Sequence, residues 1–242
     1  MKKLFTILTV VALTTTISFA QFSAKAGLNM ANIVTNNTDS SQPKLSVALD
    51  DADNGMKLGI IIGCGYAMEL SDAMSLDISV AFKQSGTKQT EDFTGGSSTM
   101  TYALNYLDIS PNLAFNVSDA MALSFGPYLA FAISGKTTGE TIITNGPTTS
   151  TSESIEFGEA TLEGELEGTG PDGISAMDFG INIGASFSIN DAMSISAGYA
   201  LGLTDLYSAD SDLEEFAKSL GEDLPSLKNS GIFLTFGYTF GG

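Results

Sequence analysis

Seven charged residues lie among small side chains in otherwise apolar segments: Lys25, Lys57, Glu69, Asp77, Lys83, Asp108 and Asp178. Ammonium groups and carboxylates at such positions can form ion pairs, or can relay a proton or a small ion. Charges removed from water are tolerated only when they are paired. We therefore interpret the set as a structural salt-bridge network, with a proton or ion path as the functional alternative.

The residue types that most hydrolytic sites require are missing. The chain has no His and a single Cys, Cys64, so Ser-His-Asp and Cys-His arrangements and His-rich zinc sites are impossible. The segment 50–55 (Asp-Asp-Ala-Asp-Asn-Gly) is rich in carboxylates, but it lacks the EF-hand spacing. Calcium binding there stays an open alternative. The sequence predicts no enzyme, no catalytic residue, no cofactor and no metal site.

The first twenty residues have the pattern of a cleaved secretory signal. Lys2 and Lys3 precede a short apolar run over 4–13, and the segment ends on Ala20 before Gln21. We expect residues 1–20 to be removed and residues 21–242 to form one domain. Without Lys2 and Lys3 the chain has eight Lys against 28 acidic residues, a net charge of −20. Such a chain is repelled by nucleic acid, which excludes that class of partner.

The elements that must position the charges are strands, because apolar residues alternate with small ones. In 57–70, Leu, Ile, Ile, Cys, Tyr, Met and Leu occupy the even positions, whereas Lys, Gly, Ile, Gly, Gly, Ala and Glu occupy the odd ones. Small residues suit a crowded, concave lumen, and bulky apolar residues suit a convex face in lipid. This inverted pattern is typical of a transmembrane barrel. A soluble barrel is the alternative, and it would stay in solution without detergent.

A repeated tripeptide gives the number of strands. Asp-Ala-Met occurs at 72–74, 119–121 and 191–193, each time between alternating segments. Three tight turns imply six strands, and one further strand at each end makes eight. Longer connections fall at about 34–55, 86–100, 136–173 and 206–229. We expect an all-β, eight-stranded antiparallel up-and-down transmembrane β-barrel with long extracellular loops and the repeated turns on the periplasmic side.

Two of the long connections have distinctive sequences. The third is acidic, and its broken alternation from Ile155 onward suggests a hairpin that extends beyond the membrane. It is interpreted as a solvated surface, with divalent-ion bridging or a basic partner as alternatives. The fourth holds a predicted short helix, with Ser211 and Glu214 as a capping box and Gly221 at its end.

Strand direction predicts the height of each charge in the lumen. Lys25, Glu69 and Asp77 should lie near the periplasmic end, on neighbouring strands. Lys57 and Lys83 should lie nearer the outer end, where Asp108 and Asp178 are the available partners. An eight-stranded lumen is just filled by side chains, which argues against a wide pore.

Several segments resemble the PorT-type outer-membrane β-barrel family. These are 22–33 (Phe-Ser-Ala-Lys-Ala-Gly-Leu-Asn-Met-Ala-Asn-Ile), 202–206 (Gly-Leu-Thr-Asp-Leu), 228–232 (Lys-Asn-Ser-Gly-Ile) and 237–240 (Gly-Tyr-Thr-Phe). The resemblance implies an eight-stranded, OmpA/OmpX-like barrel in the outer membrane, and the family's named member takes part in protein secretion and gliding. The motifs are architectural, so no functional residue carries over.

The functional expectation is a non-enzymatic outer-membrane barrel with a structural, adhesive or docking role at the cell surface. An accessory component of a secretion or gliding apparatus and a small-solute or ion channel are the alternatives. The expected partners are outer-membrane lipid, lipopolysaccharide and envelope or secretion proteins. The barrel itself is expected to be a monomer.

Overall fold

The computed structural model describes residues 22–36, 53–161, 173–221, 224 and 226–240. The signal-like segment 1–20 lies outside them, as do residues 50–52 of the carboxylate-rich stretch and the acidic residues between 162 and 172. Within these residues there are nine strands and one helix: β1 (Phe22–Asn36), β2 (Asp53–Ser71), β3 (Met74–Phe93), β4 (Gly96–Ser118), β5 (Met121–Ile143), β6 (Thr148–Ile155), β7 (Met177–Ser188), β8 (Met193–Gly202), α3 (Ser211–Leu220) and β9 (Ser226–Thr239).

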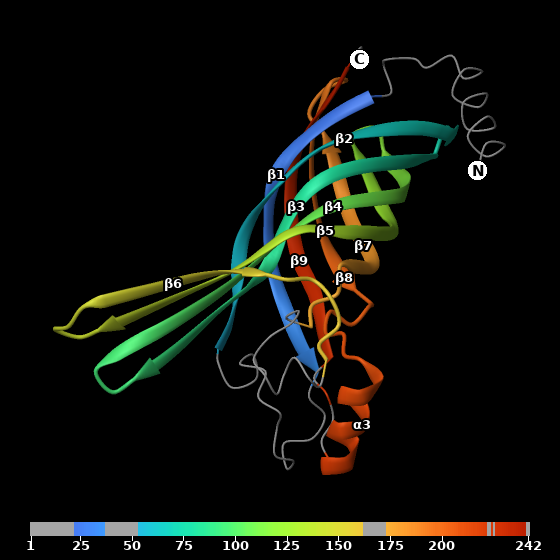
Figure 1. The fold of residues 1–242 in the computed structure, drawn as a ribbon. Helices are drawn as coiled ribbons and strands as arrows, with labels where there is room; N and C mark the ends of the chain where they lie inside the picture. Colours follow the sequence, from blue (N-terminus) through green and yellow to red (C-terminus); the bar gives the residue numbers. More distant parts are fainter. Residues whose placement is uncertain (1–21, 37–52, 162–172, 222–223, 225, 241–242) are drawn as a thin grey trace.

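Eight of these strands close into a ring. Each strand is antiparallel to its neighbours in the order β1-β2-β3-β4-β5-β7-β8-β9, and β9 pairs with β1 to complete the circle. The predicted eight-stranded up-and-down barrel is therefore confirmed (Figure 1). The remaining strand, β6, pairs with the end of β5 beyond Ser134 and is not a member of the ring.

The apolar side chains of the ring point outward, as the alternation predicts. Leu58, Ile62 and Ile183 are 62 %, 56 % and 63 % exposed, whereas Ser110 and Asp178 on the inward face are 3 % and 2 % exposed. A soluble barrel would bury the first group and expose the second. Among the residues that the structure describes, none of the helical segments has the length and apolarity to cross a bilayer.

The Asp-Ala-Met repeats form the short turns at one end of the ring. Asp72-Ala73 and Asp119-Ala120 each connect two strands directly. None of these residues has a positive φ, so the turns are not the primed types that match strand twist. A register shift beside each turn, at 69–71 and 116–118, accommodates the mismatch. In the third copy, the Asn190 side chain accepts hydrogen bonds from the backbone N–H groups of Ala192 and Met193 at 3.0 and 2.8 Å.

The predicted loop at 86–100 is wrong. β3 runs to Phe93 and β4 begins at Gly96, with every residue between Gly86 and Phe93 paired across to β4. Only Thr94 and Gly95 form the turn, where Gly95 has a φ of 98°. We call the outward apolar side chains of the ring the apolar belt. The segment 86–93 lacks apolar alternation because it extends beyond this belt, but β-branched Thr residues still favour an extended backbone.

The third long connection also continues the sheet, so the expected hairpin extension is confirmed. It is made by Lys136–Ile143 of β5 and by β6, rather than by the residues beyond Ile155 that suggested it. Phe157 and Ala160 form only isolated bridges, to Ile174 and Ala209.

The predicted helix in the fourth connection is confirmed as α3. Its N-cap, however, is Asp210, whose side chain accepts from the backbone N–H of Leu213 at 2.8 Å. The expected capping box of Ser211 and Glu214 is therefore wrong: a carboxylate caps a helix as well as a hydroxyl does, and position N3 is then Leu213. Gly221 ends the helix in the left-handed conformation, as predicted.

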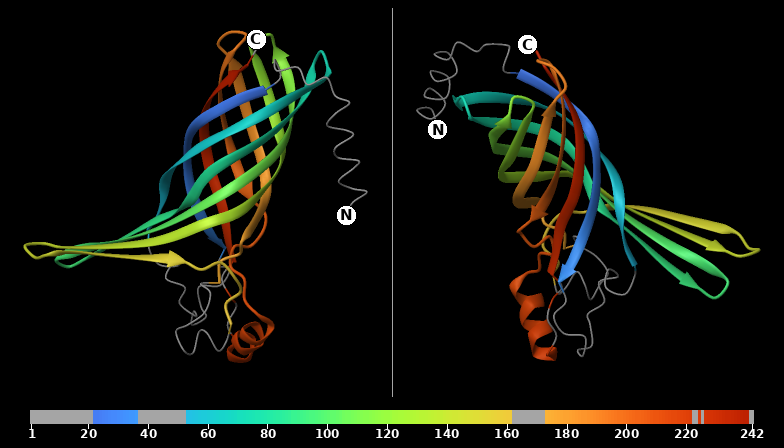
Figure 2. Two further views of the ribbon diagram at one scale, coloured as in Figure 1. Left: turned by 45° about the horizontal axis from the view of Figure 1, so that its top comes forward. Right: turned by 180° about the vertical axis from the view of Figure 1, so that it is seen from behind.

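The sheet leaves the ring at a bulge between β4 and β5. Tyr106 pairs with Ala132 and Asn105 with Ser134, so Ile133 is an extra residue on β5. An extra residue bends the strand that carries it. Beyond this point four strands project sideways from the barrel (Figure 2). We define them as the projecting sheet: 84–93 of β3, 96–105 of β4, 134–143 of β5 and all of β6.

Candidate functional site

The lumen contains one buried ion pair. Lys83 on β3 and Asp108 on β4 lie on the inward face of neighbouring strands, with Lys83 Nζ 2.6 Å from Asp108 Oδ2. Their side chains are 13 % and 7 % exposed. Asp108 also accepts a hydrogen bond from the hydroxyl of Ser110, and the Lys83 ammonium lies 4.3 Å from the ring centroid of Tyr128. Both charges are thus compensated, as buried charges must be.

Asp178 on β7 is satisfied by neutral donors. It accepts hydrogen bonds from Tyr128 Oη at 3.0 Å, from Thr204 Oγ1 at 3.0 Å and from Asn229 Nδ2 at 2.9 Å. Asn229 also lies 3.4 Å from the hydroxyl of Tyr106 and accepts from Ser85. Three donors around one carboxylate offset the loss of its hydration.

These side chains obstruct the lumen near the end with the long connections. We call Lys83, Tyr106, Asp108, Tyr128, Asp178 and Asn229 the lumen plug. Tyr106 and Tyr128 are 0 % and 1 % exposed. Gly180 is required beneath the Tyr128 ring, because a Cβ there would lie 2.6 Å from the ring Cζ. The plug is continuous with an apolar cluster that includes Leu104, Ile155, Leu206 and Leu227, so connections three and four help to close this end.

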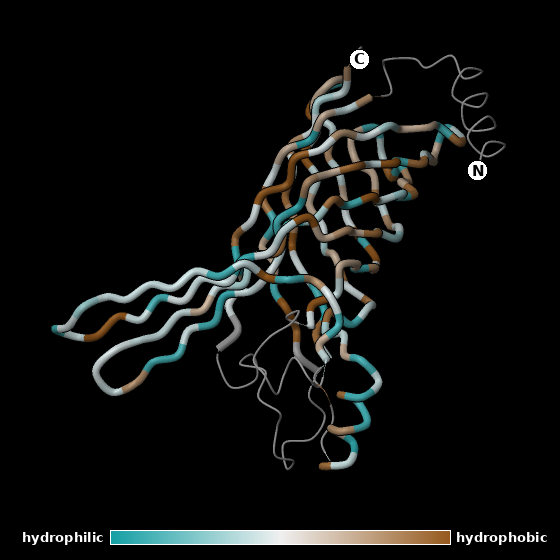
Figure 3. The backbone as a smooth tube through the Cα atoms, in the orientation of Figure 1, coloured by the Kyte–Doolittle hydropathy of each residue, from teal (hydrophilic) through white to brown (hydrophobic). Residues whose placement is uncertain are grey.

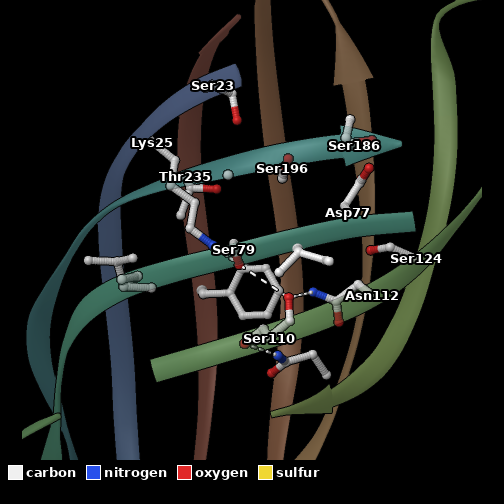
Figure 4. Close-up of a pocket in the computed structure, with 18 of the residues that line it drawn as sticks. Ser23, Lys25, Asp77, Ser79, Ser110, Asn112, Ser124, Ser186, Ser196 and Thr235 are labelled. Atoms are coloured by element: carbon white, nitrogen blue, oxygen red, sulfur yellow. Dashed lines mark hydrogen bonds between the residues drawn. The ribbon is translucent and has the colours of Figure 1, made fainter. Parts of the chain in front are cut away.

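The other half of the lumen is a polar vestibule of about 360 Å³. Nine Ser and Thr hydroxyl groups line it, from Ser23, Ser79, Ser110, Ser124, Ser186, Ser194, Ser196, Thr235 and Thr239. Lys25 donates to Ser79 Oγ at 2.8 Å, and Asp77 accepts from Ser75 at 3.1 Å. Figure 4 shows Lys25 and Asp77 on opposite sides of this space. The vestibule reaches the end that carries the short turns.

The seven residues singled out in the sequence therefore separate into distinct places. Lys83 and Asp108 are in contact, but Asp178 is held by neutral groups rather than by a Lys. Lys57 is half-buried beside Ala31 and pairs with neither aspartate. Lys25, Asp77 and the exposed Glu69 line one vestibule without forming an ion pair among themselves. The structure thus has one inward ion pair among these seven residues and not a continuous network.

Sequence reasoning missed the aromatic half of the plug. Tyr106 and Tyr128 occur on the face that otherwise carries Gly, Ala, Ser and Asn. The signal that could have revealed them was a large side chain with a polar end on the face where the other residues are mostly small. Asn229 gave no comparable signal, because its partners Ser85, Tyr106 and Asp178 come from β3, β4 and β7.

The boundary between the apolar belt and the projecting sheet is a polar ladder on the outer face. Gln84 Nε2 donates to Asn105 Oδ1 at 3.0 Å, and Asn105 Nδ2 donates to Ser134 Oγ at 2.9 Å. The preceding outward residues, Phe82, Leu107 and Ile133, are apolar. On β3, β4 and β5 the outward side chains therefore change from apolar to polar at the same height above the ring.

Beyond the ladder the sheet is dominated by hydroxyl side chains. Thr90 and Thr99 face each other across β3 and β4 at 3.4 Å, as do Ser98 and Thr141 across β4 and β5. Figure 3 shows pale and hydrophilic colours along most of both hairpins, in contrast to the brown outward positions of the ring. The two faces of the sheet are thus suited to water rather than to lipid.

The hairpin tips are an exception. Phe93, Ile142 and Ile143 are 45 %, 47 % and 44 % exposed. Phe93 pairs with Gly96, which in turn pairs with Ile143. The tips of two neighbouring hairpins therefore carry three large apolar side chains far from the belt, with Phe93 and Ile143 on one face of the sheet and Ile142 on the other. We call this trio the apolar tip.

Within the described residues, no group of three or more His, Cys, Asp and Glu is arranged to hold a metal ion. The only Cys, Cys64, is exposed on the outward face of the ring.

Comparison with known proteins gives one family and several solved structures. Residues 14–208 match the sequence model of the family described as outer membrane protein beta-barrel domain. Ail of Yersinia pestis is 13 % identical, with 90 % of this chain and 97 % of that chain covered and a TM-score of 0.39. Neisserial surface protein A is 11 % identical, with the same coverages and a TM-score of 0.46. OprG of Pseudomonas aeruginosa is 11 % identical, with coverages of 92 % and 96 % and a TM-score of 0.34.

No curated protein matches the chain. The family match extends from before β1 to beyond β8, which is well over half of the sequence. The outward apolar belt and the closed ring are what a barrel in a bilayer requires, because lipid leaves no partner for an open sheet edge. The chain belongs to the outer membrane protein beta-barrel domain family.

Proposed function

We propose that this protein is a non-enzymatic docking or adhesion barrel of the outer membrane, which contacts other surfaces through its projecting sheet. The observation that carries the proposal is the apolar tip. Soluble surfaces rarely gather large apolar side chains without a binding role, and aromatic residues are enriched among those that dominate binding energy. The absence of His from the whole chain supports a role without catalysis.

The position of the tip supports the same proposal. Phe93, Ile142 and Ile143 lie at the far ends of hairpins that are otherwise rich in Ser and Thr. The projecting sheet, whose strands are hydrogen-bonded to one another, carries them away from the barrel, beyond the belt. Ordered strands hold a contact patch at a smaller entropic cost than a flexible loop does.

Cells of a non-adherent host that display the protein would test this role. The assay is attachment to immobilised envelope vesicles, to protein-coated glass and to hydrophobic plastic. We expect Phe93→Ser with Ile143→Ser to reduce attachment to the wild-type target severalfold, whereas Thr90→Ser on the stalk leaves it unchanged. Equal attachment of wild type, tip variant and empty host on every surface would refute the docking role.

The location in the envelope follows the same reasoning. We propose that residues 1–20 are a cleaved export signal, supported by the charged start and the short apolar run, and N-terminal sequencing of the membrane-extracted protein would test it. Outer-membrane lipid and lipopolysaccharide would surround the belt. The long connections and the projecting sheet would then face the outside of the cell.

Channel activity is a second candidate, favoured by the polar vestibule. The lumen plug opposes it, because the large side chains of Tyr106 and Tyr128 are buried beside the Lys83–Asp108 pair. We expect folded wild-type protein to be silent in planar bilayers. Steady single-channel currents from the wild type would contradict a lumen closed by the plug and would support the channel candidate.

An accessory role in secretion or gliding is supported only by the PorT-type strand motifs. Its test is co-purification with large envelope complexes in mild detergent.

A further inference from the structure

β6 has a free edge. It pairs with β5 from Thr148 to Ile155, and with no other strand of the described chain. All residues from Thr148 to Ser154 are exposed. The strands of the ring are paired on both sides where the ring closes. Within the described chain, the long unpaired edge of the projecting sheet is therefore that of β6.

The edge lacks the features that usually prevent such pairing. Exposed edges are normally protected by Lys, Pro, bulges or inward charges. The sequence of β6 is Thr-Thr-Ser-Thr-Ser-Glu-Ser-Ile, with Glu153 as its single charge. Its pairing with β5 is regular over eight successive residues. The strand is therefore flat, nearly uncharged and open to a partner.

The direction of β6 selects the kind of partner. The strand runs crosswise to the barrel, as the yellow arrow in the left view of Figure 2 shows. Because the sheet bends outward at Ile133, its outer face turns toward the belt, and its plane approaches that of the bilayer. Two copies in one membrane have the same side up, so a two-fold axis between them must lie along the membrane normal.

A two-fold axis perpendicular to a sheet produces an antiparallel pair of edge strands. That is the pairing a free β6 can make with β6 of a second copy. The two barrels would then lie at opposite ends of the paired strands, about one strand length apart, and would not collide. The two-fold axis along the membrane normal is thus the axis that antiparallel pairing of two β6 strands requires.

We propose that β6 pairs with β6 of a second copy, centred on Thr151, to form one continuous sheet of eight strands across a dimer. In this register Ser150 faces Ser152, Thr149 faces Glu153 and Thr148 faces Ser154 of the other copy. No two like charges are opposite each other. Hydroxyl groups face hydroxyl groups at the centre, a favourable pairing across antiparallel strands.

The dimer goes beyond the proposed docking role, because it uses the β6 edge rather than the apolar tip. It departs from the monomer expected from the sequence, although the ring itself closes without a partner. Each proposal can fail without the other, and the tip variant Phe93→Ser with Ile143→Ser serves to separate them. That variant should keep its dimer.

Single cysteines in a Cys64→Ala background provide the first test, with the full-length protein in lipid nanodiscs and a short bifunctional thiol reagent. Thr151→Cys should cross-link to its copy, because the two side chains are directly opposite. Thr148→Cys alone should not, since its copy lies about 20 Å away along the strand. An equimolar mixture of Thr148→Cys and Ser154→Cys should cross-link, and Thr138→Cys on β5 is the matched control.

A charge exchange provides the second test. Thr151→Glu places two carboxylates opposite each other, with Glu153 beside them, and should weaken dimerisation about fivefold or more. Mixing it with Thr151→Lys should restore a heterodimer, as measured by native mass spectrometry. Cross-linking that is equal at Thr151, Thr148 and Thr138, or a wild type that stays monomeric at all lipid dilutions, would overturn the proposal.

Discussion

Replacing Lys83 with Met tests the lumen plug at its strongest contact. Lys83 Nζ lies 2.6 Å from Asp108 Oδ2, and the two side chains are 13 % and 7 % exposed. Removing one partner of a buried pair costs about 3–5 kcal/mol, because the other charge remains without compensation. The substitution also removes the contact with the Tyr128 ring, whose centroid is 4.3 Å away.

The hydroxyl of Ser110 still donates to Asp108 and offsets part of this loss. We therefore expect Lys83→Met to lower the free energy of unfolding by about 3 kcal/mol. Adding Asp108→Leu should recover much of it, because an apolar pair of similar volume is often no less stable than an ion pair. The coupling energy of the double-mutant cycle should be about 2 kcal/mol or more.

Urea unfolding in phospholipid vesicles is the appropriate assay. The chain has no Trp, so far-UV circular dichroism and heat-modifiable gel migration report the folded fraction. Lys88→Met on the exposed projecting sheet is the matched control, with an expected effect within about 0.5 kcal/mol. A Lys83→Met cost below about 1 kcal/mol, together with additive single effects, would refute a plug held by this pair.

Three further predictions concern other parts of the fold. Ile62→Lys, at an outward position that is 56 % exposed, should destabilise the barrel in vesicles by about 2–4 kcal/mol, and an unchanged urea midpoint would contradict a lipid-facing position. Gly86→Val should cost about 1–3 kcal/mol in the same assay, because Gly86 has a φ of 121° and a Cβ there would collide with the Tyr102 carbonyl. Asp210→Ala removes the N-cap of α3 and should destabilise that helix by about 1 kcal/mol. Hydrogen exchange should then be faster in 211–220 while the stability of the barrel is unchanged. Unaltered protection of 211–220 would reject Asp210 as the cap.

The barrel was predictable because its signals are local and repeated. Asp-Ala-Met marks the three short turns at one end of the ring, and the period-two alternation of strands such as 57–70 assigns one face to lipid. Both signals survive in the sequence because every bilayer-spanning strand needs them. The strand number of the ring and its outward apolar face follow directly.

The projecting sheet was not predictable by the same means. Residues such as Thr90 and Thr99 face water on the sheet, so no apolar alternation distinguishes that strand pair from a loop. The prediction of the lumen contacts was incomplete for a different reason. Strand heights predicted the contact of Lys83 with Asp108. Asp178 is instead held by the neutral residues Thr204 and Asn229, which a search for opposite charges does not find.

Cys64 allows the central claim, a barrel whose apolar side faces lipid, to be measured at a native position. The residue is exposed on the outward face of β2, and it is the chain's single Cys. A nitroxide attached to it in vesicles should collide frequently with oxygen, which concentrates in lipid, and rarely with a water-soluble nickel chelate. A label at Ser196→Cys in the vestibule, with Cys64 replaced by Ala, is the inward control. The reverse accessibility at Cys64, with nickel favoured over oxygen, would contradict the inverted barrel.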